Sequence, residues 1–373
     1  MKIMIPNKPF VRFILMVVAF CMAAHEATGQ DTGRSIDFPD IPGYRTLKCD
    51  LHMHTVFSDG SVWPDIRVRE ALRDGLDAIA LTDHIEVQPH QGDIPHPDRN
   101  RSYQIALYAA RGSGLIVING AEITRAMPPG HANAIFVEDV NKLNQEDMME
   151  VFREARRQDA FVFWNHPHWT KQKPDGVASP DKIHFDLFSE GLIQGIEIYN
   201  EYTYSDEALQ IALDNNLTIL GTSDIHGLID WQFEVPLGGH RPVTLVFARE
   251  KSPEALKEAL QNRRTAVWFD NTLVGNPQFL VPMIEQSLVA EREGETAVQN
   301  VTIENLSDAD YIMENRSEFL LHNKASVFTL KAHENTLLQV KTLKVLESFT
   351  LRFEVLNAFI EPGNHPEIEI EIK

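Results

Sequence analysis

Cysteine is almost absent from this chain, which has two cysteines among 373 residues. Cys21 falls in a segment that we expect to be removed, so Cys49 would be the only thiol of the mature protein. A single cysteine cannot form an intramolecular disulfide, and Cys49 sits in an apolar stretch, where it reads as a small core residue. A zinc site built from thiolates is therefore excluded, and any metal site would have to use imidazoles and carboxylates.

A hydrophobic run long enough to cross a membrane is also missing. The apolar stretch 13–24 covers about a dozen residues, whereas a membrane-spanning helix needs about 20. Basic residues precede this stretch and small residues follow it, which is the order of a cleavable secretory signal. We expect residues 1–29 to be a signal peptide and the mature protein to be periplasmic or secreted, without a membrane span. A retained N-terminal anchor is the alternative, and a lipoprotein is disfavoured because the bulky Phe20 precedes Cys21.

Positive charge is scarce, with 34 lysines and arginines against 54 acidic residues and a net charge of −20. Removal of residues 1–29 would shift the net charge to −22, because that segment carries three positive charges and one negative charge. So acidic a chain lacks the basic surface that binding to nucleic-acid backbones requires, and we expect no stable nucleic-acid binding. The acidity fits a soluble exported protein and carboxylates that hold cations. The net charge does not indicate the oligomeric state.

Short apolar strands alternate with amphipathic helices between residues 44 and 272. This alternation favours parallel strands in an α/β barrel or an open sheet. Two strands, 134–138 and 243–248, interrupt it, and the link from Glu122 to His131 is too short for a crossover helix. We therefore expect both strands to run antiparallel and to return His131, and His240, to the rim where the parallel strands end. The expected parallel strands are 46–51, 77–81, 115–119, 161–164, 195–199 and 218–221, and the expected helices are 64–74, 102–111, 145–158 and 206–215.

The pattern changes after residue 276. Segments near 300–304, 326–331, 338–341, 350–355 and 367–372 alternate apolar and polar residues, as half-buried strands do. No helical stretch separates them, which predicts a small C-terminal β-sandwich-like domain over 276–373. This domain has no cluster of reactive residues, and we expect it to serve in packing or attachment.

Candidate metal ligands follow at least five of the predicted strands. Each short motif alone has an ordinary explanation, because a single His or Asp at a strand end is usually a cap or a solvated residue. However, His52 and His54, two apart in an extended segment, point to the same side. Catalytic groups of parallel α/β folds gather where the carboxyl ends of the strands meet, so the whole set indicates a metal site. The other candidates are Asp59, Asp83, His84, Glu86, Glu122, His131, His166, His168, Asp224 and His226.

Together these motifs resemble the polymerase and histidinol phosphatase (PHP) superfamily. They appear in the family's order over residues 44–250 as His52-x-His54 with Asp59, Thr82-Asp83-His84, Gly120-x-Glu122, His131, His166-Pro167 and Asp224-x-His226. The resemblance implies a distorted (β/α)7 barrel that holds two or three divalent metal ions and hydrolyses phosphate esters. By position it implies nine ligands, which are His52, His54, Asp59, His84, Glu122, His131, His166, Asp224 and His226. Many members have His where Asp59 stands, and others have Asp. Export and the β-rich tail resemble the secreted phosphodiesterases of this family.

Imidazole and carboxylate ligands without thiolates suit manganese, zinc or iron. With such ions we expect a metal-bound hydroxide to attack phosphorus in line, without a covalent intermediate, and Glu122 to bridge two ions. Three further residues receive catalytic hypotheses. Asp83 is expected to orient a neighbouring imidazole. His168 is expected either to protonate the leaving group or to lie at the rim. Arg241 is expected either to clamp phosphate or to form a surface salt bridge. Tyr199 and Asn200 are expected to line the pocket.

The substrate class expected from this reading is a small phosphate ester. Export favours a phosphodiesterase acting on external diesters, with a phosphomonoesterase of the same family as the alternative. An amidohydrolase-type barrel also begins with His-x-His, but it would not need Asp59, His84 or Glu122. A non-catalytic binder of metal or phosphate is the rival from another class of protein.

Overall fold

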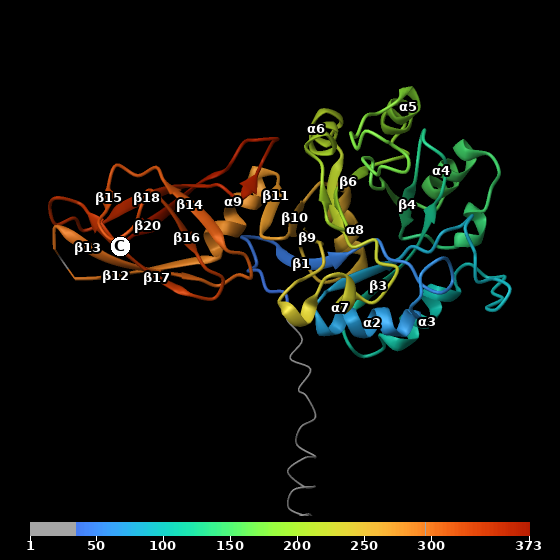
Figure 1. Ribbon diagram of the computed structural model, residues 1–373, viewed down its shortest axis with the longest axis horizontal. Helices are drawn as coiled ribbons and strands as arrows, with labels where there is room; N and C mark the ends of the chain where they lie inside the picture. The colour runs from blue at the N-terminus through green and yellow to red at the C-terminus, as the bar shows by residue number, and fades with distance from the viewer. Residues whose placement is uncertain (1–34, 295) are drawn as a thin grey trace, which may run out of the picture. The chain divides into compact units, whose positions relative to one another are not determined.

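The computed structural model describes residues 35–294 and 296–373 of the chain (Figure 1). The expected signal peptide over residues 1–29, with Cys21, lies outside these described residues. Among the helices that are described, none combines the length and the apolar character needed to cross a bilayer. The described part contains the expected α/β domain and, after residue 287, a domain made of strands.

The α/β domain is built on a 12-stranded sheet. Its strands are β1 (Arg45–Asp50), β2 (Ala78–Leu81), β3 (Ile116–Ile123), β4 (Ala132–Ile135), β5 (Phe161–Trp164), β6 (Gly195–Asn200), β7 (Thr203–Tyr204), β8 (Thr218–Thr222), β9 (Val243–Ala248), β10 (Thr265–Phe269), β11 (Thr272–Gly275) and the short β19 (Ala358–Phe359). Its helices are α2 (Pro64–Arg73), α3 (Arg101–Ala109), α4 (Met148–Arg157), α5 (Lys182–Ser189), α6 (Asp206–Asn215), α7 (Ile229–Gln232), α8 (Pro253–Gln261) and α9 (Pro277–Gln286), with 3-10 turns at η1 (Val140–Leu143) and η2 (Val235–Leu237).

Several of these helices begin where a side chain caps the first turn. Asp147, Ser205 and Ser252 accept hydrogen bonds from the backbone N–H groups of the first turns of α4, α6 and α8. Such caps satisfy donors that a helix leaves unpaired at its start. The buried side of each helix is its apolar stripe, for example Val68 and Ala71 of α2.

The sheet curls into a distorted barrel, as the sequence predicts. Strands follow the order β19-β11-β10-β9-β1-β2-β3-β4-β5-β6-β7, and β8 also pairs with β6. The backbone beyond β8 then meets the backbone beyond β1, since the Asp224 N–H donates to the His52 carbonyl (3.0 Å) and the His54 N–H to the Ile225 carbonyl (3.0 Å). The segment that follows β8 is therefore held beside the segment that follows β1.

Both return strands run antiparallel, which confirms the prediction made from the short links. Strand β4 is antiparallel to β3 and β5, and β9 is antiparallel to β1 and β10. Ala132 pairs with Ile123, so His131, just before β4, is returned to the end of β3 that carries Glu122. His240 instead stacks its ring on Trp268, with 3.7 Å between ring centroids.

The C-terminal domain consists of two four-stranded sheets, which confirms the expected β-sandwich (orange to red in Figure 1). Alternate residues are buried along its strands, as in β20, where each isoleucine is buried and each glutamate exposed. Strand β19 of this region pairs with β11 of the barrel. One sheet has the order β12 (Leu288–Glu293), β13 (Val298–Asn305), β17 (Asn335–Lys341) and β15 (Leu320–Leu321), and the other β16 (Val327–Leu330), β14 (Tyr311–Asn315), β18 (Phe349–Val355) and β20 (Glu367–Ile372).

Candidate metal centre

The structure brings all nine expected ligands together at the carboxyl ends of the strands. Each histidine has a ring nitrogen within 4 Å of a carboxylate oxygen of the set, and each carboxylate lies as close to a histidine. Eight of the nine, all except Asp224, form three overlapping groups, and within each group the ligand atoms lie within 4.8 Å of one another. The groups are His54–Asp59–His84–His226, His52–His54–Glu122 and Glu122–His131–His166.

The first group surrounds the carboxylate of Asp59. Its Oδ1 lies 3.2 Å from His226 Nε2 and 3.7 Å from His54 Nδ1, and its Oδ2 lies 3.4 Å from His84 Nε2. The side chains of Asp59 and His226 are 34% and 37% exposed, whereas His54 is fully buried. This group is therefore the part of the centre that solvent reaches most readily.

The second group lies deeper, around His52 and His54. Their Nε2 atoms lie 3.1 and 3.0 Å from Asp224 Oδ1, and 3.5 and 3.3 Å from Glu122 Oε2. Two buried imidazoles thus face two carboxylate oxygens. Asp224 lies beside this group, in contact with the two imidazoles.

The third group uses the other oxygen of the same glutamate. Glu122 Oε1 lies 2.6 Å from His131 Nδ1 and 3.7 Å from His166 Nε2. Because Glu122 belongs to the second and third groups and His54 to the first and second, the three positions form one continuous cluster.

The donor atoms of this cluster fit divalent cations. Both oxygens of Glu122, one oxygen each of Asp59 and Asp224, and Nδ1 of His131 are buried, and among the described residues none of them forms a hydrogen bond of regular geometry; their near neighbours are the other donors of the cluster. Buried polar atoms are nearly always paired, so a cluster of unpaired ones indicates an ion as their missing partner. The described donors comprise imidazoles and carboxylates, a set suited to manganese, zinc or iron.

The protonation states also agree with metal binding. Burial and the nearby His226 lower the pKa of His54 to about 4, which leaves the imidazole neutral and able to bind a cation. Burial opposes charge on Glu122 and Asp224, yet the neighbouring imidazoles hold both pKa values below the usual range. Burial likewise opposes charge on His84, but the Glu122 carboxylate raises its pKa to about 10. Bound cations would take the place of such protons, which links metal affinity to pH.

Unusual backbone geometry helps to place two of the ligands. His166 and Asp224 have φ values of 28° and 47°, in the left-handed region that side chains other than glycine seldom adopt. Each residue follows a strand end, and the turn redirects its side chain toward the centre. Gly60 serves the same purpose for Asp59, because a Cβ at Gly60 would lie 2.7 Å from the Thr55 nitrogen.

Glu197 is a functional residue that the sequence reasoning missed. It is fully buried in β6 and accepts hydrogen bonds from His52 Nδ1 (2.7 Å), Thr222 Oγ1 (2.6 Å) and the His166 backbone N–H (2.7 Å). A carboxylate behind a ligating histidine fixes the tautomer and the ring orientation, so Glu197 positions His52. An acidic residue between two isoleucines of a buried strand was the available signal.

Asn200 was expected to line the pocket, and its place in the pocket stays a prediction. Its side-chain amide donates to Glu197 Oε2 (2.9 Å) and to Asp224 Oδ2 (3.3 Å), so it supports the centre directly. Tyr199 packs its ring against Tyr204 and Phe269 and forms part of the core.

Asp83 does not bind an imidazole, contrary to the hypothesis drawn from the sequence. Among the described residues it accepts hydrogen bonds from the Thr55 N–H and hydroxyl and from Ser58 Oγ (2.7 Å). Ser58 Oγ lies 3.4 Å from His54 Nδ1, so Asp83 reaches the ligand only through the loop after β1. Its carboxylate fixes that loop.

Arg241 is a second correction, because it is fully buried and belongs to the interior. Its guanidinium donates to Asp74 Oδ2 (2.7 Å) and to Asp50 Oδ2 (3.1 Å). Asp50 in turn accepts from the N–H and hydroxyl of Ser223, the residue before Asp224. A guanidinium held in this way is neither a phosphate clamp nor a surface salt bridge, and it supports the turn that carries a ligand.

His168 is buried, and its Nε2 lies 2.8 Å from Thr203 Oγ1. Its Nδ1 has no hydrogen bond among the described residues. Burial, together with the charge of His166, lowers the pKa of His168. Its role as a proton donor stays a prediction.

Comparisons with known proteins agree with this geometry. Residues 50–194 match the PHP domain family and residues 285–371 an Ig-like domain family (DUF5001). A comparison with curated proteins found no match. A crystal structure from Bacteroides vulgatus, described as a two-domain protein containing a predicted PHP-like metal-dependent phosphoesterase, is 42% identical, with a TM-score of 0.84 over 90% of this chain and 98% of that one.

Two more distant structures also align with part of the chain. They are a putative metal-dependent phosphoesterase from Bifidobacterium adolescentis (17% identity, TM-score 0.39) and an amidohydrolase from Chromobacterium violaceum (16% identity, TM-score 0.34). Each alignment covers 48% of this chain and 87% of the other, and neither bears on function. The identity and coverage of the Bacteroides vulgatus structure decide the family: the chain belongs to the PHP-like metal-dependent phosphoesterases and carries a C-terminal Ig-like domain.

Proposed function

We propose that this protein is an exported phosphodiesterase that hydrolyses small phosphate diesters with two or three divalent ions of manganese, zinc or iron. The observation that carries the proposal is the continuous cluster of three donor groups joined through His54 and Glu122. Three adjacent positions with shared ligands would keep cations close together, which is the arrangement used by enzymes that transfer phosphoryl groups.

Bound divalent ions would supply Lewis-acid polarisation of the phosphoryl oxygens and activation of the attacking water. The protein's own groups then set the geometry. Glu122 directs one oxygen toward His52 and His54 and the other toward His131 and His166, and so spaces the two deeper positions. Glu197 holds the ring of His52 in place. We assign to His168 the donation of a proton to the leaving oxygen.

Two considerations favour a diester over a monoester. Among the described residues, the ligand side chains form ion pairs only between imidazoles and carboxylates. The nearby Arg241 is already paired with Asp50 and Asp74. At the reacting phosphoryl group, a monoester dianion would thus depend on the metal ions for its charge compensation, whereas a diester carries one charge less there. An N-terminal signal would also place the enzyme where external diesters occur.

The alternative of an amidohydrolase-type barrel is disfavoured by one contact. His84 and Asp59 are unnecessary in such a site, yet here His84 Nε2 lies 3.4 Å from Asp59 Oδ2 in the group that also contains His226. No contact in the structure argues against a monoesterase, and the comparison of diester and monoester turnover decides between the two.

The test uses the chain from residue 30 onward, stripped of metal and reloaded with manganese, zinc or iron(II). Turnover of bis(4-nitrophenyl) phosphate, 4-nitrophenyl phosphate and 4-nitrophenyl acetate would be compared at equal metal content. We expect the diester to react fastest with at least one metal. Faster turnover of the monoester would establish the monoesterase, and turnover of the acetate alone would overturn the phosphoesterase.

Export is tested separately. The full-length chain would be expressed in a Gram-negative host, the periplasm released, and the amino terminus of the product sequenced. We expect the mature chain to begin near Gln30. An intact Met1 on a product confined to the cytoplasm would refute export.

A further inference from the structure

A cavity adjoins the metal centre on the side of His84. Two adjoining hollows share the side chains of Gln88, His96 and Arg99 as walls. The smaller hollow, of about 10 Å³, is lined by the ligand His84, by Asp83 and by Phe57 of the loop after β1. The larger has a volume of about 330 Å³, which lies within the usual range for small-molecule sites. His84 therefore belongs both to the metal centre and to the wall of the smaller hollow.

Arg99 is the cation of this cavity. Among the described residues its guanidinium takes part in no hydrogen bond or ion pair, and only its backbone N–H is engaged, by Asn141 Oδ1 (2.9 Å). The acidic side chain whose charge acts on it is Glu86, which is already paired with Arg125 Nε (3.1 Å) and with the Thr124 N–H (2.9 Å). The donors of Arg99 are therefore open to a ligand.

Two further carboxylates near the cavity are also occupied, Asp83 by the hydroxyls of Thr55 and Ser58, and Asp98 by three amides. Asp98 accepts hydrogen bonds from the amide groups of Asn100 (2.9 Å), Asn141 (2.9 Å) and Gln104 (3.1 Å). These bonds lower the pKa of Asp98 to about 2, so it stays ionised with its oxygens directed at amide donors. It does not neutralise Arg99, which follows it in the chain.

The cavity wall contains two buried polar atoms that also lack partners. Gln88 Oε1 and His96 Nδ1 form no hydrogen bond among the described residues, although both are shielded from solvent. The His96 ring is held edge-on against Phe57, with 4.8 Å between centroids. The amide nitrogen of Gln88 donates to the backbone carbonyl of the ligand His84, which ties the wall to the centre. Buried unpaired atoms on a cavity wall indicate a polar ligand.

We propose that this cavity receives the organic group of the substrate and that Arg99 binds an anionic substituent on it. The substrate class is then a phosphate ester whose organic group carries a second negative charge, from a carboxylate or a phosphoryl group. A guanidinium forms paired hydrogen bonds with either anion. This inference rests on the proposed function for the identity of the reacting ester, but the binding at Arg99 can be measured without turnover.

The experiment measures binding of non-hydrolysable analogues to the manganese-loaded chain. Methyl (4-carboxybenzyl)phosphonate is compared by calorimetry with its uncharged carbamoyl counterpart, and a 4-(phosphonomethyl) analogue provides the phosphoryl arm. The same comparison is made by kinetics with methyl 4-carboxyphenyl phosphate and methyl 4-carbamoylphenyl phosphate. We expect the anionic member of each pair to bind about 10- to 100-fold more tightly, as charged hydrogen bonds allow.

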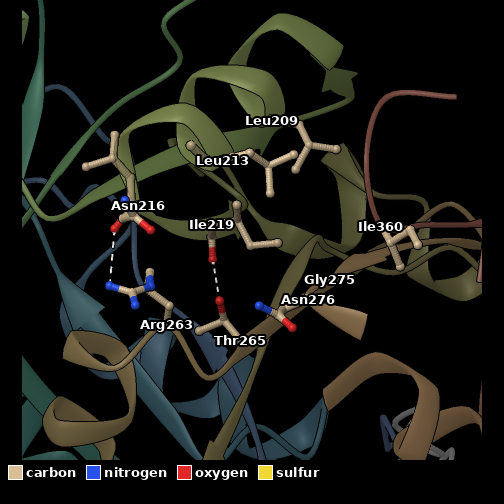
Figure 2. Close-up of a pocket in the computed structure, with 11 residues that line it drawn as sticks. Leu209, Leu213, Asn216, Ile219, Arg263, Thr265, Gly275, Asn276 and Ile360 are labelled. Atoms are coloured by element: carbon tan, nitrogen blue, oxygen red, sulfur yellow. Dashed lines mark hydrogen bonds between the residues drawn. The ribbon is translucent and has the colours of Figure 1, made fainter. Parts of the chain in front are cut away.

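Arg99→Gln should abolish this preference, and Arg99→Lys should keep part of it. The matched control is Arg263→Gln, because Arg263 lines a separate cavity of about 100 Å³ with Ile219 and Thr265, at the opposite end of β8 from Asp224 (Figure 2). There its guanidinium donates to the Asn216 carbonyl (3.5 Å). This variant should leave the anion preference intact.

The outcomes separate the two proposals. Whichever of the carboxylate and phosphoryl analogues loses more affinity in Arg99→Gln identifies the preferred anion. Equal affinity for charged and uncharged analogues in the unmodified protein, no binding of any analogue, or a preference unchanged in Arg99→Gln would each overturn the inference. An Arg99-dependent preference without turnover of any ester would keep the inference and reject the diesterase.

Discussion

Replacement of Arg241 by leucine should destabilise the barrel rather than weaken substrate binding. Its guanidinium donates three hydrogen bonds, from Nε and Nη2 to Asp74 Oδ2 (2.9 and 2.7 Å) and from Nη1 to Asp50 Oδ2 (3.1 Å). The Asp50 side chain is fully buried and that of Asp74 is 6% exposed. The variant would leave Asp50 in the interior without a cation and Asp74 with Arg73 as its cation.

The magnitude follows from what remains after the change. Asp50 would keep only its two bonds from Ser223, and Asp74 its bonds from Arg73. Removal of one partner from a buried ion pair costs about 3–5 kcal/mol, because the remaining charge is desolvated and uncompensated. Domains unfold with about 5–15 kcal/mol, so this loss would be a large part of the total.

The assay is urea-induced unfolding of the metal-free chain, followed by circular dichroism, with KM for bis(4-nitrophenyl) phosphate measured on the manganese-loaded protein. Arg249→Gln is the matched control, because Arg249 is exposed just beyond the same strand, β9. Arg241→Lys should fall between the native protein and Arg241→Leu. An unchanged urea midpoint for Arg241→Leu, together with a KM raised about tenfold, would show that Arg241 contacts substrate and would refute the reasoning.

Three further changes test the site and the fold. Glu197→Gln should weaken manganese binding about 10- to 100-fold by calorimetry, because His52 loses its orienting carboxylate; unaltered affinity would contradict that role. Asp224→Ala should abolish turnover and lower the bound metal measured by mass spectrometry, and full metal content would exclude it as a ligand. Burial opposes ionisation of Asp77, but the hydrogen bond from Lys251 lowers the pKa of its carboxyl. The ionised Asp77 therefore stabilises the fold above the pKa that it has in the unfolded chain, and this stabilisation is lost as the pH falls through its pKa in the folded chain. Asp77→Asn should therefore cost about 1 kcal/mol at pH 7 and progressively less below pH 4 in urea titrations, and a constant difference would argue against the pair.

The sequence was informative wherever function depends on residue type and order. Histidines and carboxylates that follow apolar strands predicted a common edge, and the short link after Glu122 predicted the antiparallel return of His131. Both follow from backbone geometry, because parallel strands end together and a short link cannot cross over. Strand β5 has the bounds expected for it, and β3 extends farther, through Glu122.

The interior was harder to predict, because a single residue does not reveal its own burial. Arg241 reads as a surface group beside a strand, yet it is enclosed between two carboxylates. Glu197 reads as one residue of an apolar strand, yet it fixes a ligand. The helices α8 and α9 were not predicted either, and α9 contains Pro282 inside the helix, a residue that normally argues against one. In each case tertiary partners outweigh the local pattern.

Closure of the barrel and assembly of the metal centre are one structural event in this chain. The hydrogen bonds that join the segments after β8 and β1 use the backbone of ligands themselves, from the Asp224 N–H to the His52 carbonyl and from the His54 N–H to the Ile225 carbonyl. The same residues place Nε2 of His52 and of His54 at 3.1 and 3.0 Å from Asp224 Oδ1. A cation bound there would therefore hold the seam shut, and an open seam would separate the ligands. Because metal then binds only the closed form, its binding free energy adds to the stability of the barrel.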